Sequence, residues 1–487
     1  MTDIEIADQL VSAGRFREAE AIYRQVLARV KNDGRALWGL GRIAHRIGKL
    51  EQAIVLLEAA ANSLPREPYP LLSLVDALND NHRESDALTV LEHARDHAHP
   101  IAQTDYLLGL QYLMLGRTDD ALTAFRRCLN DRNNRVFSFA LYEVSRLKSF
   151  STRDDDFVQI ESALDGAPAN STDAMRMSYA LGKACDDLGD YQTAFAHLAR
   201  ANSIQLAQCD FRTKDMKTHF DAVIEHSNAL LRLNLEHGDA GNPAPIFIVG
   251  LPRSGSTLLE QMLSRHSQIA GAGETKTLSN DVIGYLSREI GTPYPQLQAA
   301  LTPSLLQIGA TIYGDAMTSR ANGCAFVVDK ALFNFQSIGL IYRLFPNAKV
   351  IHLRRDIRAI AWSVYKNYFA ENEPYFCDLE EFKCYAAYYE RLIAHWKTTF
   401  PGCMHEVSYE NLVTDPRACL ENLLAFCGLE FEPQCLEAQL GEGVAVHTLS
   451  AHEVRAPLHS HSLTRWKPYE QQLTKVQLAA ATLSEER

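Results

Sequence analysis

Small and large apolar residues recur along the first part of the chain at a fixed spacing. Ala19, Ala53, Ala87 and Ala121 lie 34 residues apart, and three of the four have a glycine five residues before them. Each alanine is followed four residues later by a large apolar side chain, in turn Tyr23, Leu57, Leu91 and Phe125. Stacked helix-turn-helix units need small residues where helices approach, large ones in the grooves and glycine at helix ends. The pattern therefore predicts an all-α solenoid.

A further copy of the pattern surrounds Ala194, whose distance from Ala121 is not a multiple of 34. At the same offsets stand Gly182, Gly189 and Leu198. Residues 135–172, between the two copies, are a divergent unit or an insertion. The repeats resemble the tetratricopeptide repeat over residues 3–205. That resemblance implies an array that binds a peptide or a partner protein on its concave face.

The hydrophobic pattern changes after residues 236–245, where glycine, proline and asparagine mark a linker. Short apolar runs rich in β-branched residues, typical of buried parallel strands, follow at 246–249, 325–328 and 349–353. Helical patterns follow the later runs, at 334–344 and 358–369. This alternation predicts an α/β domain with a mainly parallel sheet and a ligand site at the carboxyl ends of its strands.

We therefore expect a tetratricopeptide-repeat domain at 1–205, a helical connector and linker at 206–243, and an α/β domain at 244–487. A chain of 487 residues with 46% hydrophobic and 22% charged residues fits two globular domains. The net charge of -12 argues against a broad nucleic-acid surface. A local cluster of arginines can still bind a small anion in an acidic protein.

The cysteines and the termini indicate a cytoplasmic protein. None of the ten cysteines forms a CxxC pair, so we expect neither a disulfide scaffold nor structural zinc, but free thiols in a reducing compartment. The N-terminus lacks the basic start and apolar core of a signal peptide. No run of about 18 uncharged apolar residues predicts a transmembrane helix.

Anion-directed groups follow the first apolar run directly. After Gly250 the chain continues with Arg253, Ser254, Gly255, Ser256 and Thr257, and then a helical pattern. Glycines let the backbone approach a ligand, and backbone N–H groups at a helix N-terminus face an anion. Arginine and hydroxyl side chains add donors for oxyanions. The alternative is a plain strand-to-helix turn. The lysine of a Walker loop is missing, which disfavours a standard nucleoside triphosphatase.

The segment Pro252 to Thr257 resembles the phosphosulfate loop of the sulfotransferases. The Pro-Arg variant is similar to the tyrosylprotein branch and to bacterial tetratricopeptide-repeat sulfotransferases, and the resemblance covers about residues 244–470. It implies a P-loop-like sulfotransferase fold. It also implies 3′-phosphoadenylyl sulfate as the sulfuryl donor, 3′,5′-adenosine bisphosphate as the product, and no required metal.

Two further residues match the family's motif for the 3′-phosphate of the donor. In that motif an arginine at a strand end and a serine eight residues later hold the phosphate, and Arg355 and Ser363 have this spacing. Eight residues are about two helical turns, which returns to nearly the same face. Asn367 stands where the tyrosylprotein enzymes have another arginine. The alternative for this segment is a solvated, ion-paired helix start.

The resemblance also implies the groups that carry the chemistry. Glu274 follows Arg253 at the spacing of the family's catalytic glutamate, and a carboxylate there would take the proton of an acceptor hydroxyl. Lys330, with Arg253, would stabilise charge on the leaving oxygen. The alternatives are a carboxylate that favours a helix dipole and a surface lysine. Glu260 and Glu289 lack this context.

Three residues toward the C-terminus complete the expected donor site. Tyr409, in the segment Ser408 to Leu412, resembles the family's nucleotide-contacting tyrosine. Ser450 and Arg465 occupy the first serine and the basic position of a motif that closes over the donor, with arginine where the tyrosylprotein enzymes have lysine. Both basic residues bind phosphate, although with different geometry.

These observations favour an enzyme that moves a sulfuryl group from 3′-phosphoadenylyl sulfate to an acceptor hydroxyl. One alternative is a nucleotide-dependent kinase or triphosphatase with a P-loop-type site. The other is a non-catalytic tetratricopeptide scaffold with a degenerate transferase domain. The acceptor is left open between a peptide or protein tyrosine, a carbohydrate, a lipid and a small molecule, because specificity lies in the acceptor pocket. A peptide acceptor would suit the repeat domain.

Overall fold

The computed structural model describes residues 2–81, 83–97, 102–210, 212–233, 243–369, 373–437, 460–474 and 476. The described chain forms two compact units, one up to Ser149 and one from Phe150 onward. None of the described helices combines the length and the apolar composition of a membrane span.

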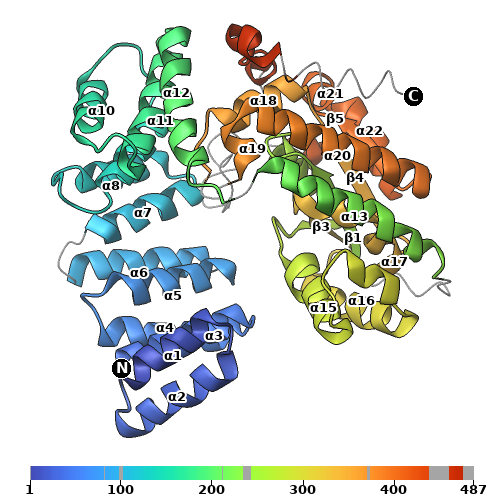
Figure 1. Ribbon diagram of the computed structural model, residues 1–487, viewed down its shortest axis with the longest axis horizontal. Helices are drawn as coiled ribbons and strands as arrows, with labels where there is room; N and C mark the ends of the chain where they lie inside the picture. The colour runs from blue at the N-terminus through green and yellow to red at the C-terminus, as the bar shows by residue number, and fades with distance from the viewer. Residues whose placement is uncertain are drawn as a thin grey trace. The chain divides into compact units, whose positions relative to one another are not determined.

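In the part of the first unit that the structure describes, the secondary structure is helical, and the helices follow one another as antiparallel pairs (Figure 1). They are α1 (Asp3–Ser12), α2 (Phe16–Arg29), α3 (Gly34–Arg46), α4 (Leu50–Ser63), α5 (Pro68–Asp80), α6 (Glu84–His97), α7 (Ala102–Met114), α8 (Thr118–Cys128) and α9 (Phe137–Leu147).

The repeated residues of the sequence meet inside these pairs. A Cβ added to Gly109 of α7 would lie 2.3 Å from the ring of Phe125 in α8, so only glycine leaves room for that ring. The four alanines that are 34 residues apart are completely buried. The glycines five residues before three of them adopt φ of about 75–81°, which ends the first helix of each pair. The repeated residues of the sequence are thus the ones that pack each helix against its partner.

The second unit begins with helices and continues as an α/β domain. Its helices are α10 (Asp155–Gly166), α11 (Thr172–Asp187), α12 (Tyr191–Leu206), α13 (Thr213–Leu231), α14 (Ser256–Leu263), α15 (Gly284–Ile290), α16 (Pro303–Thr318), α17 (Ile338–Leu344), α18 (Ile357–Tyr365), α19 (Pro374–Cys377), α20 (Leu379–Thr399), α21 (Tyr409–Thr414) and α22 (Pro416–Cys427). Its strands are β1 (Ala244–Gly250), β2 (Ile269–Gly271), β3 (Phe326–Asp329), β4 (Lys349–Arg354) and β5 (Met404–Ser408).

The five strands form one parallel sheet in the order β2-β3-β1-β4-β5. In the central strand, Ile246 pairs in register with Val328 of β3 and Lys349 of β4. Because all strands run the same way, their carboxyl ends share one edge, where the segments after β1, β3 and β4 begin. An N-terminal helical-repeat solenoid followed by an α/β domain with a parallel sheet was predicted from the sequence and is confirmed.

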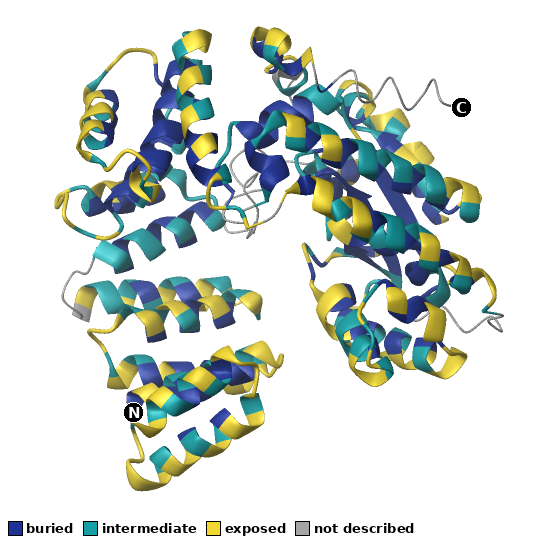
Figure 2. Ribbon diagram, in the orientation of Figure 1, coloured by how far each residue is buried: buried dark blue, intermediate teal, exposed yellow. Residues whose placement is uncertain are grey.

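Alternate residues of β1 face opposite sides of the sheet and are buried on both. Ile246 and Ile248 pack in a core with side chains of α14 and α22, whereas Phe247 packs against the rings of Tyr313 and Phe345. The central strand β1 is therefore buried along nearly its whole length (Figure 2), whereas the edge strands β2 and β5 are only partly buried. Helices α13 and α20 pack against each other in this unit (Figure 1).

The hairpin of α11 and α12 belongs to the same compact unit as the sheet. The side chain of Asn202 donates a hydrogen bond to the carbonyl of Tyr365 at 2.8 Å, and that of Gln205 donates to the carbonyl of Phe369 at 2.7 Å. The hydroxyl of Tyr179 bonds both amide side chains at 2.8 Å. A buried polar network from α11 and α12 thus satisfies the carbonyl of Tyr365, the last residue of α18, which the helix leaves without an intrahelical partner. The same network satisfies the carbonyl of Phe369 in the segment after α18.

Candidate functional site

The segment between β1 and α14 forms a tight loop at the carboxyl edge of the sheet. Arg253 and Gly255 adopt positive φ, 67° and 101°. Such a conformation costs a non-glycine residue about 1–2 kcal/mol, so at Arg253 the surrounding structure must impose it. A Cβ on Gly250 would lie 2.7 Å from the carbonyl oxygen of Leu353, and one on Gly255 would lie 2.2 Å from the ring of Tyr409. Both glycines are therefore required by close packing.

The hydroxyl residues of the loop are buried. Ser254 is completely buried, and Ser256 and Thr257 occupy the first two positions of α14, where backbone N–H groups lack intrahelical partners. Among the described residues, the hydroxyl of Ser254 has no hydrogen-bond partner. An orphaned buried hydroxyl beside a helix N-terminus is a position at which an anion can be bound.

The two predicted phosphate-binding regions are hydrogen-bonded to each other. The Nε of Arg253 donates to Oγ of Ser363 in α18 at 2.9 Å. In return, Nη1 of Arg355 donates to the carbonyl of Arg253 at 2.9 Å. The side chain of Asn367 donates to the carbonyl of Ser363 at 2.7 Å, one helical turn back. Here, therefore, Asn367 bonds the backbone of its own segment.

Tyr409 lies against Arg355. The guanidinium of Arg355 stands 4.3 Å from the centre of the Tyr409 ring, a cation–π geometry. The hydroxyl of Tyr409 bonds Oγ of Ser462 at 2.8 Å, and Nη2 of Arg355 donates to the Ser462 carbonyl at 2.7 Å. A C-terminal segment is thereby attached to the same edge of the sheet.

The structure describes only one of the two residues that were expected to close over the donor. Ser450 lies outside the described residues. Arg465 is exposed, and its charge contributes to lowering the pKa of Lys183 in α11, a shift caused first by burial of that lysine. With the other described residues Arg465 forms no hydrogen bond or ion pair, so its role remains a prediction.

Glu274 and Lys330, the two residues to which the sequence assigns the chemistry, lie next to each other. The Nζ of Lys330 lies 2.9 Å from Oε1 of Glu274, and the lysine side chain is 1% exposed while that of Glu274 is 55% exposed. Lys330 follows β3 directly, and its backbone N–H donates to the carbonyl of Gly273 at 3.0 Å. The arrangement places a half-exposed carboxylate beside a buried cation, with the carboxylate open to an incoming hydroxyl.

Two buried acids at this edge were not among the residues predicted from the sequence. Glu260 of α14 accepts a hydrogen bond from the N–H of Gly273 at 2.8 Å and lies 3.5 Å from Nζ of Lys330. Asp329 is completely buried and accepts hydrogen bonds from the hydroxyls of Tyr313 and Thr275. Burial raises the pKa of Asp329 to about 6. A charged residue inside an apolar helix or strand pattern was the available signal for both.

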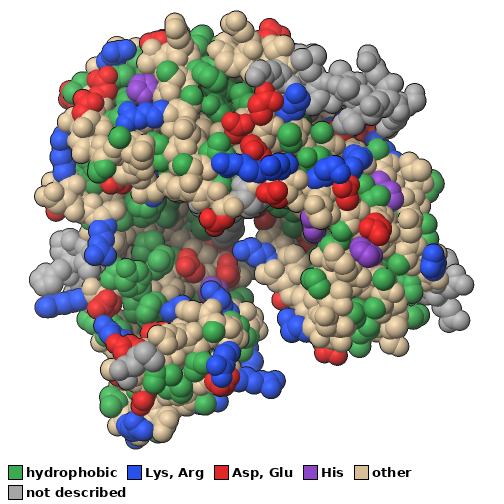
Figure 3. Space-filling view, in the orientation of Figure 1, with side chains coloured by type: hydrophobic (Ala, Val, Ile, Leu, Met, Phe, Trp, Pro, Cys, Tyr) green, Lys and Arg blue, Asp and Glu red, His purple; other side chains and the backbone are tan. Residues whose placement is uncertain are grey.

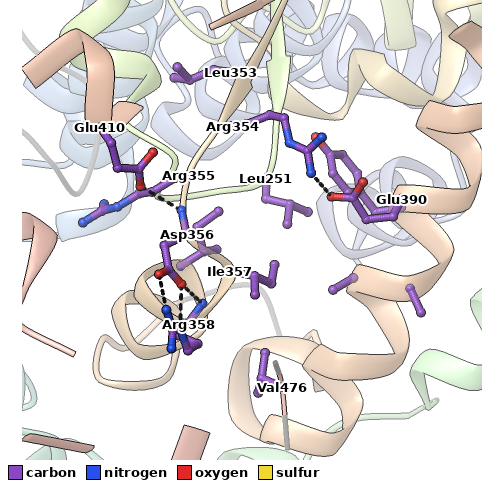
Figure 4. Close-up of a pocket in the computed structure, with 14 residues that line it drawn as sticks. Leu251, Leu353, Arg354, Arg355, Asp356, Ile357, Arg358, Glu390, Glu410 and Val476 are labelled. Carbon is purple, nitrogen blue, oxygen red and sulfur yellow. Dashed lines mark hydrogen bonds and ion pairs between the residues drawn. The ribbon is translucent and has the colours of Figure 1, made fainter. Parts of the chain in front are cut away.

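A cavity of about 420 Å³ opens beside the end of β4 (Figure 4). Its walls are largely apolar, with Leu251, Leu353, Ile357, Ile360 and Val476 among them. Figure 4 shows the ion pairs at its polar side, Arg354 with Glu390 and Arg358 with Asp356. Arg355 lines the cavity too, so the cavity borders the arginine pair described above.

The wider surface has no single charge character on the face in view. Acidic and basic side chains are interspersed there (Figure 3). Within the described chain, no three His, Cys, Asp or Glu side chains are grouped as ligands of a metal ion would be.

Comparison with known proteins identifies the two parts of the chain. Residues 245–433 match the model described as "Sulfotransferase family", and residues 4–68 match that of the tetratricopeptide repeat. The second part of the chain is a sulfotransferase domain. It follows tetratricopeptide repeats, and it is similar to protein-tyrosine sulfotransferases.

Two curated relatives and one solved structure show the extent of the similarity. The chain is 25% identical to an uncharacterized protein of Aquifex aeolicus, over 97% of this chain and 68% of the relative. It is 26% identical to protein-tyrosine sulfotransferase 1 of Danio rerio, over 45% of this chain and 65% of that protein. The sulfotransferase domain of the Synechococcus PCC 7002 olefin synthase, 24% identical, aligns with a TM-score of 0.37 over 51% of this chain and 98% of that chain. The chain spans about two thirds of the length of these curated relatives.

Proposed function

We propose that the sulfotransferase domain transfers a sulfuryl group from 3′-phosphoadenylyl sulfate to an acceptor hydroxyl. The observation that carries the proposal is the hydrogen-bonded link between the loop after β1 and α18. Arg253 donates to Ser363, and Arg355 donates to Arg253. Two arginines and a serine at one edge of a parallel sheet supply the donors that a ligand with two phosphate groups needs.

The residues of the loop fit such a donor. The buried hydroxyl of Ser254 lacks a partner among the described residues, and leaving it so costs about 1–3 kcal/mol. An oxyanion bound by Arg253, Ser254, Gly255, Ser256 and Thr257 would supply that partner. Arg355 and Ser363 would hold the 3′-phosphate, and Tyr409 would contact the nucleotide. Ser450 and Arg465 would close over it.

The chemistry is assigned to Glu274 and Lys330. When bound, the donor supplies the sulfuryl group and a bisphosphate as leaving group. Glu274 would accept the proton of the acceptor hydroxyl at its half-exposed carboxylate. The buried ammonium of Lys330, with the guanidinium of Arg253, would stabilise the negative charge that develops on the leaving oxygen. A cation stabilises a nearby negative charge more strongly in a poorly solvated site than in water.

Binding of 3′,5′-adenosine bisphosphate, measured by titration calorimetry, tests the donor. We expect the double variant Arg253→Ala, Arg355→Ala to bind at least tenfold more weakly than the wild type, since each removed charge-assisted bond contributes about 1.5–3 kcal/mol. The matched control is Arg288→Ala, Arg417→Ala, which removes two exposed arginines of the same unit. Equal binding by the wild type and the site variant would refute the proposal. Magnesium-dependent ATP turnover by the wild type would favour a triphosphatase instead.

For the acceptor we propose a tyrosine of a peptide or protein, presented by the repeats. Support comes from the similarity of residues in the second unit to protein-tyrosine sulfotransferases and from the repeats ahead of it. The test offers labelled donor to a tyrosine-containing peptide library, to the same peptides with phenylalanine, and to glycan and lipid fractions. Label on the tyrosine peptides alone is expected. Label that appears only on glycans or lipids would exclude the tyrosine acceptor while leaving the donor proposal intact.

A further inference from the structure

Glu260 is a carboxylic acid that is buried inside the protein. It stands in the second turn of α14, the helix that begins at the phosphate-binding loop, between the buried Leu259 and Met262. Its side chain is 7% exposed. Burial raises the pKa of Glu260, and the nearby charge of Lys330 opposes that rise. An ionised carboxylate in such a place costs several kcal/mol unless hydrogen bonds and a counter-ion compensate it.

Both compensating partners of Glu260 belong to the segments that carry the proposed chemistry. Its Oε1 accepts the N–H of Gly273, the residue before Glu274, at 2.8 Å. Gly273 adopts φ of 70°, so this bond fixes the turn that presents Glu274. Its Oε2 lies 3.5 Å from Nζ of Lys330. The backbone N–H of Lys330 in turn donates to the carbonyl of Gly273. The segments that contain Glu260, Gly273 and Lys330 are therefore all bonded to one another.

The ammonium of Lys330 therefore lies beside two carboxylates that differ in their exposure to solvent. Glu274 is 55% exposed and open to an acceptor, whereas Glu260 is enclosed by protein. In the proposed reaction Glu274 becomes neutral when it takes the acceptor proton. At that moment a buried ammonium paired with Glu274 alone would lose its counter-ion. A second carboxylate that stays ionised keeps the ammonium charged and in place.

We propose that Glu260 is a positioning residue of the transfer step, which holds Lys330 and the Gly273 turn while Glu274 gains the proton. This inference rests on the proposed sulfuryl transfer. It assigns the two glutamates different tasks. Glu274 exchanges the proton, and Glu260 supplies a constant negative charge behind Lys330.

The decisive variant is Glu260→Gln, because glutamine keeps the size and the acceptor for the Gly273 N–H but removes the charge. We expect kcat to fall about 10- to 100-fold, the range that displacement of a reacting group by about 1 Å produces. The KM for donor and the Kd for 3′,5′-adenosine bisphosphate should stay within twofold of wild type. The control Glu289→Gln removes one exposed charge of the same domain and should leave all three constants unchanged.

A double-mutant cycle with Lys330→Met shows whether Glu260 acts through Lys330. If it does, Glu260→Gln lowers kcat less than twofold in the Lys330→Met background. Glu260→Asp, which keeps the charge on a shorter side chain, should recover part of kcat, and it replaces glutamine in the cycle if the glutamine variant fails to fold. An unchanged kcat in Glu260→Gln, a loss of donor binding, or additive effects in the cycle would overturn the inference. A wild-type protein that binds no bisphosphate would refute the proposed function itself, which separates the two failures.

Discussion

The Nε of Arg253 donates a hydrogen bond to Oγ of Ser363 at 2.9 Å, across 110 residues of sequence. The carbonyl of Arg253 accepts a second bond from Arg355 at 2.9 Å. The loop after β1 and the start of α18 are thus connected in both directions. A change at either place should therefore disturb both ends of the proposed donor site.

We expect Ser363→Ala to weaken binding of 3′,5′-adenosine bisphosphate about tenfold. The substitution removes the proposed ligand of the 3′-phosphate and also the bond to Arg253, and a hydrogen bond to a charged group contributes about 1.5–3 kcal/mol. Titration calorimetry measures the effect. Ser319→Ala, an exposed serine that ends α16, is the control and should bind like the wild type. Binding by Ser363→Ala that matches this control would show that Ser363 holds no phosphate.

Gly255→Ala should abolish most of the donor binding. The new Cβ would lie 2.2 Å from the Tyr409 ring, in a residue whose φ of 101° disfavours side chains. Either the loop or Tyr409 must move, and we expect at least a tenfold weaker Kd for the bisphosphate. Gly314→Ala serves as the control, because a Cβ there meets no atom within 4 Å and alanine favours the helix. Full binding by Gly255→Ala would mean that the loop geometry is not needed.

Much of this architecture was predictable from the sequence, because the repeats and three of the strands are continuous patterns. Strands β1, β3 and β4 form where apolar β-branched runs occur. By contrast, β2 has only three residues and β5 reads Met-His-Glu-Val-Ser, so neither gives a clear apolar run. Both are edge strands, which need less burial.

Within the candidate site, sequence patterns predicted residue types but few of the contacts. Glu274 and Lys330 were each assigned from a motif, but their ion pair was not predicted. The charged position of Glu260 in an apolar helical pattern gave a signal, but it did not indicate which residues Glu260 contacts. The partners of Glu260 lie 13 and 70 positions away in the sequence, and the pairing of β2 with β3 brings their segments together. Long-range contacts of this kind have no local signature.

Asp329 should make stability depend on pH. Burial raises its pKa to about 6, above the 3.8 usual for this carboxyl, so the folded protein favours the neutral form. The resulting stabilisation is complete below pH 3.8 and is lost as pH rises through about 6. Between about pH 4.5 and 7, the free energy of unfolding should fall ~2 kcal/mol more in the wild type than in Asp329→Asn. Urea unfolding at both pH values measures this difference. An equal change in the free energy of unfolding for the two proteins would contradict the prediction.

In the repeats, Gly109→Ala should destabilise the first unit by about 1–3 kcal/mol, the usual cost of overpacking. Its Cβ would lie 2.3 Å from the ring of Phe125, and Phe125→Leu in the same chain should restore part of the loss. Gly166→Ala, with no atom within 4 Å of the new Cβ, is the control. Unfolding followed by circular dichroism gives the values. A neutral Gly109→Ala would show that the helices can separate without cost.

The amide side chains of Asn202 and Gln205 have a practical meaning for anyone who shortens this protein. They bond the carbonyl of Tyr365, the last residue of the helix that carries Ser363, and the carbonyl of Phe369 in the segment that follows. A fragment cut at residue 244 would keep the sheet and the loop but lose that support. One that starts near residue 150 would keep it. The smallest piece that preserves the proposed donor site is therefore expected to include a helical hairpin that, by its sequence, looks like the last of the repeats.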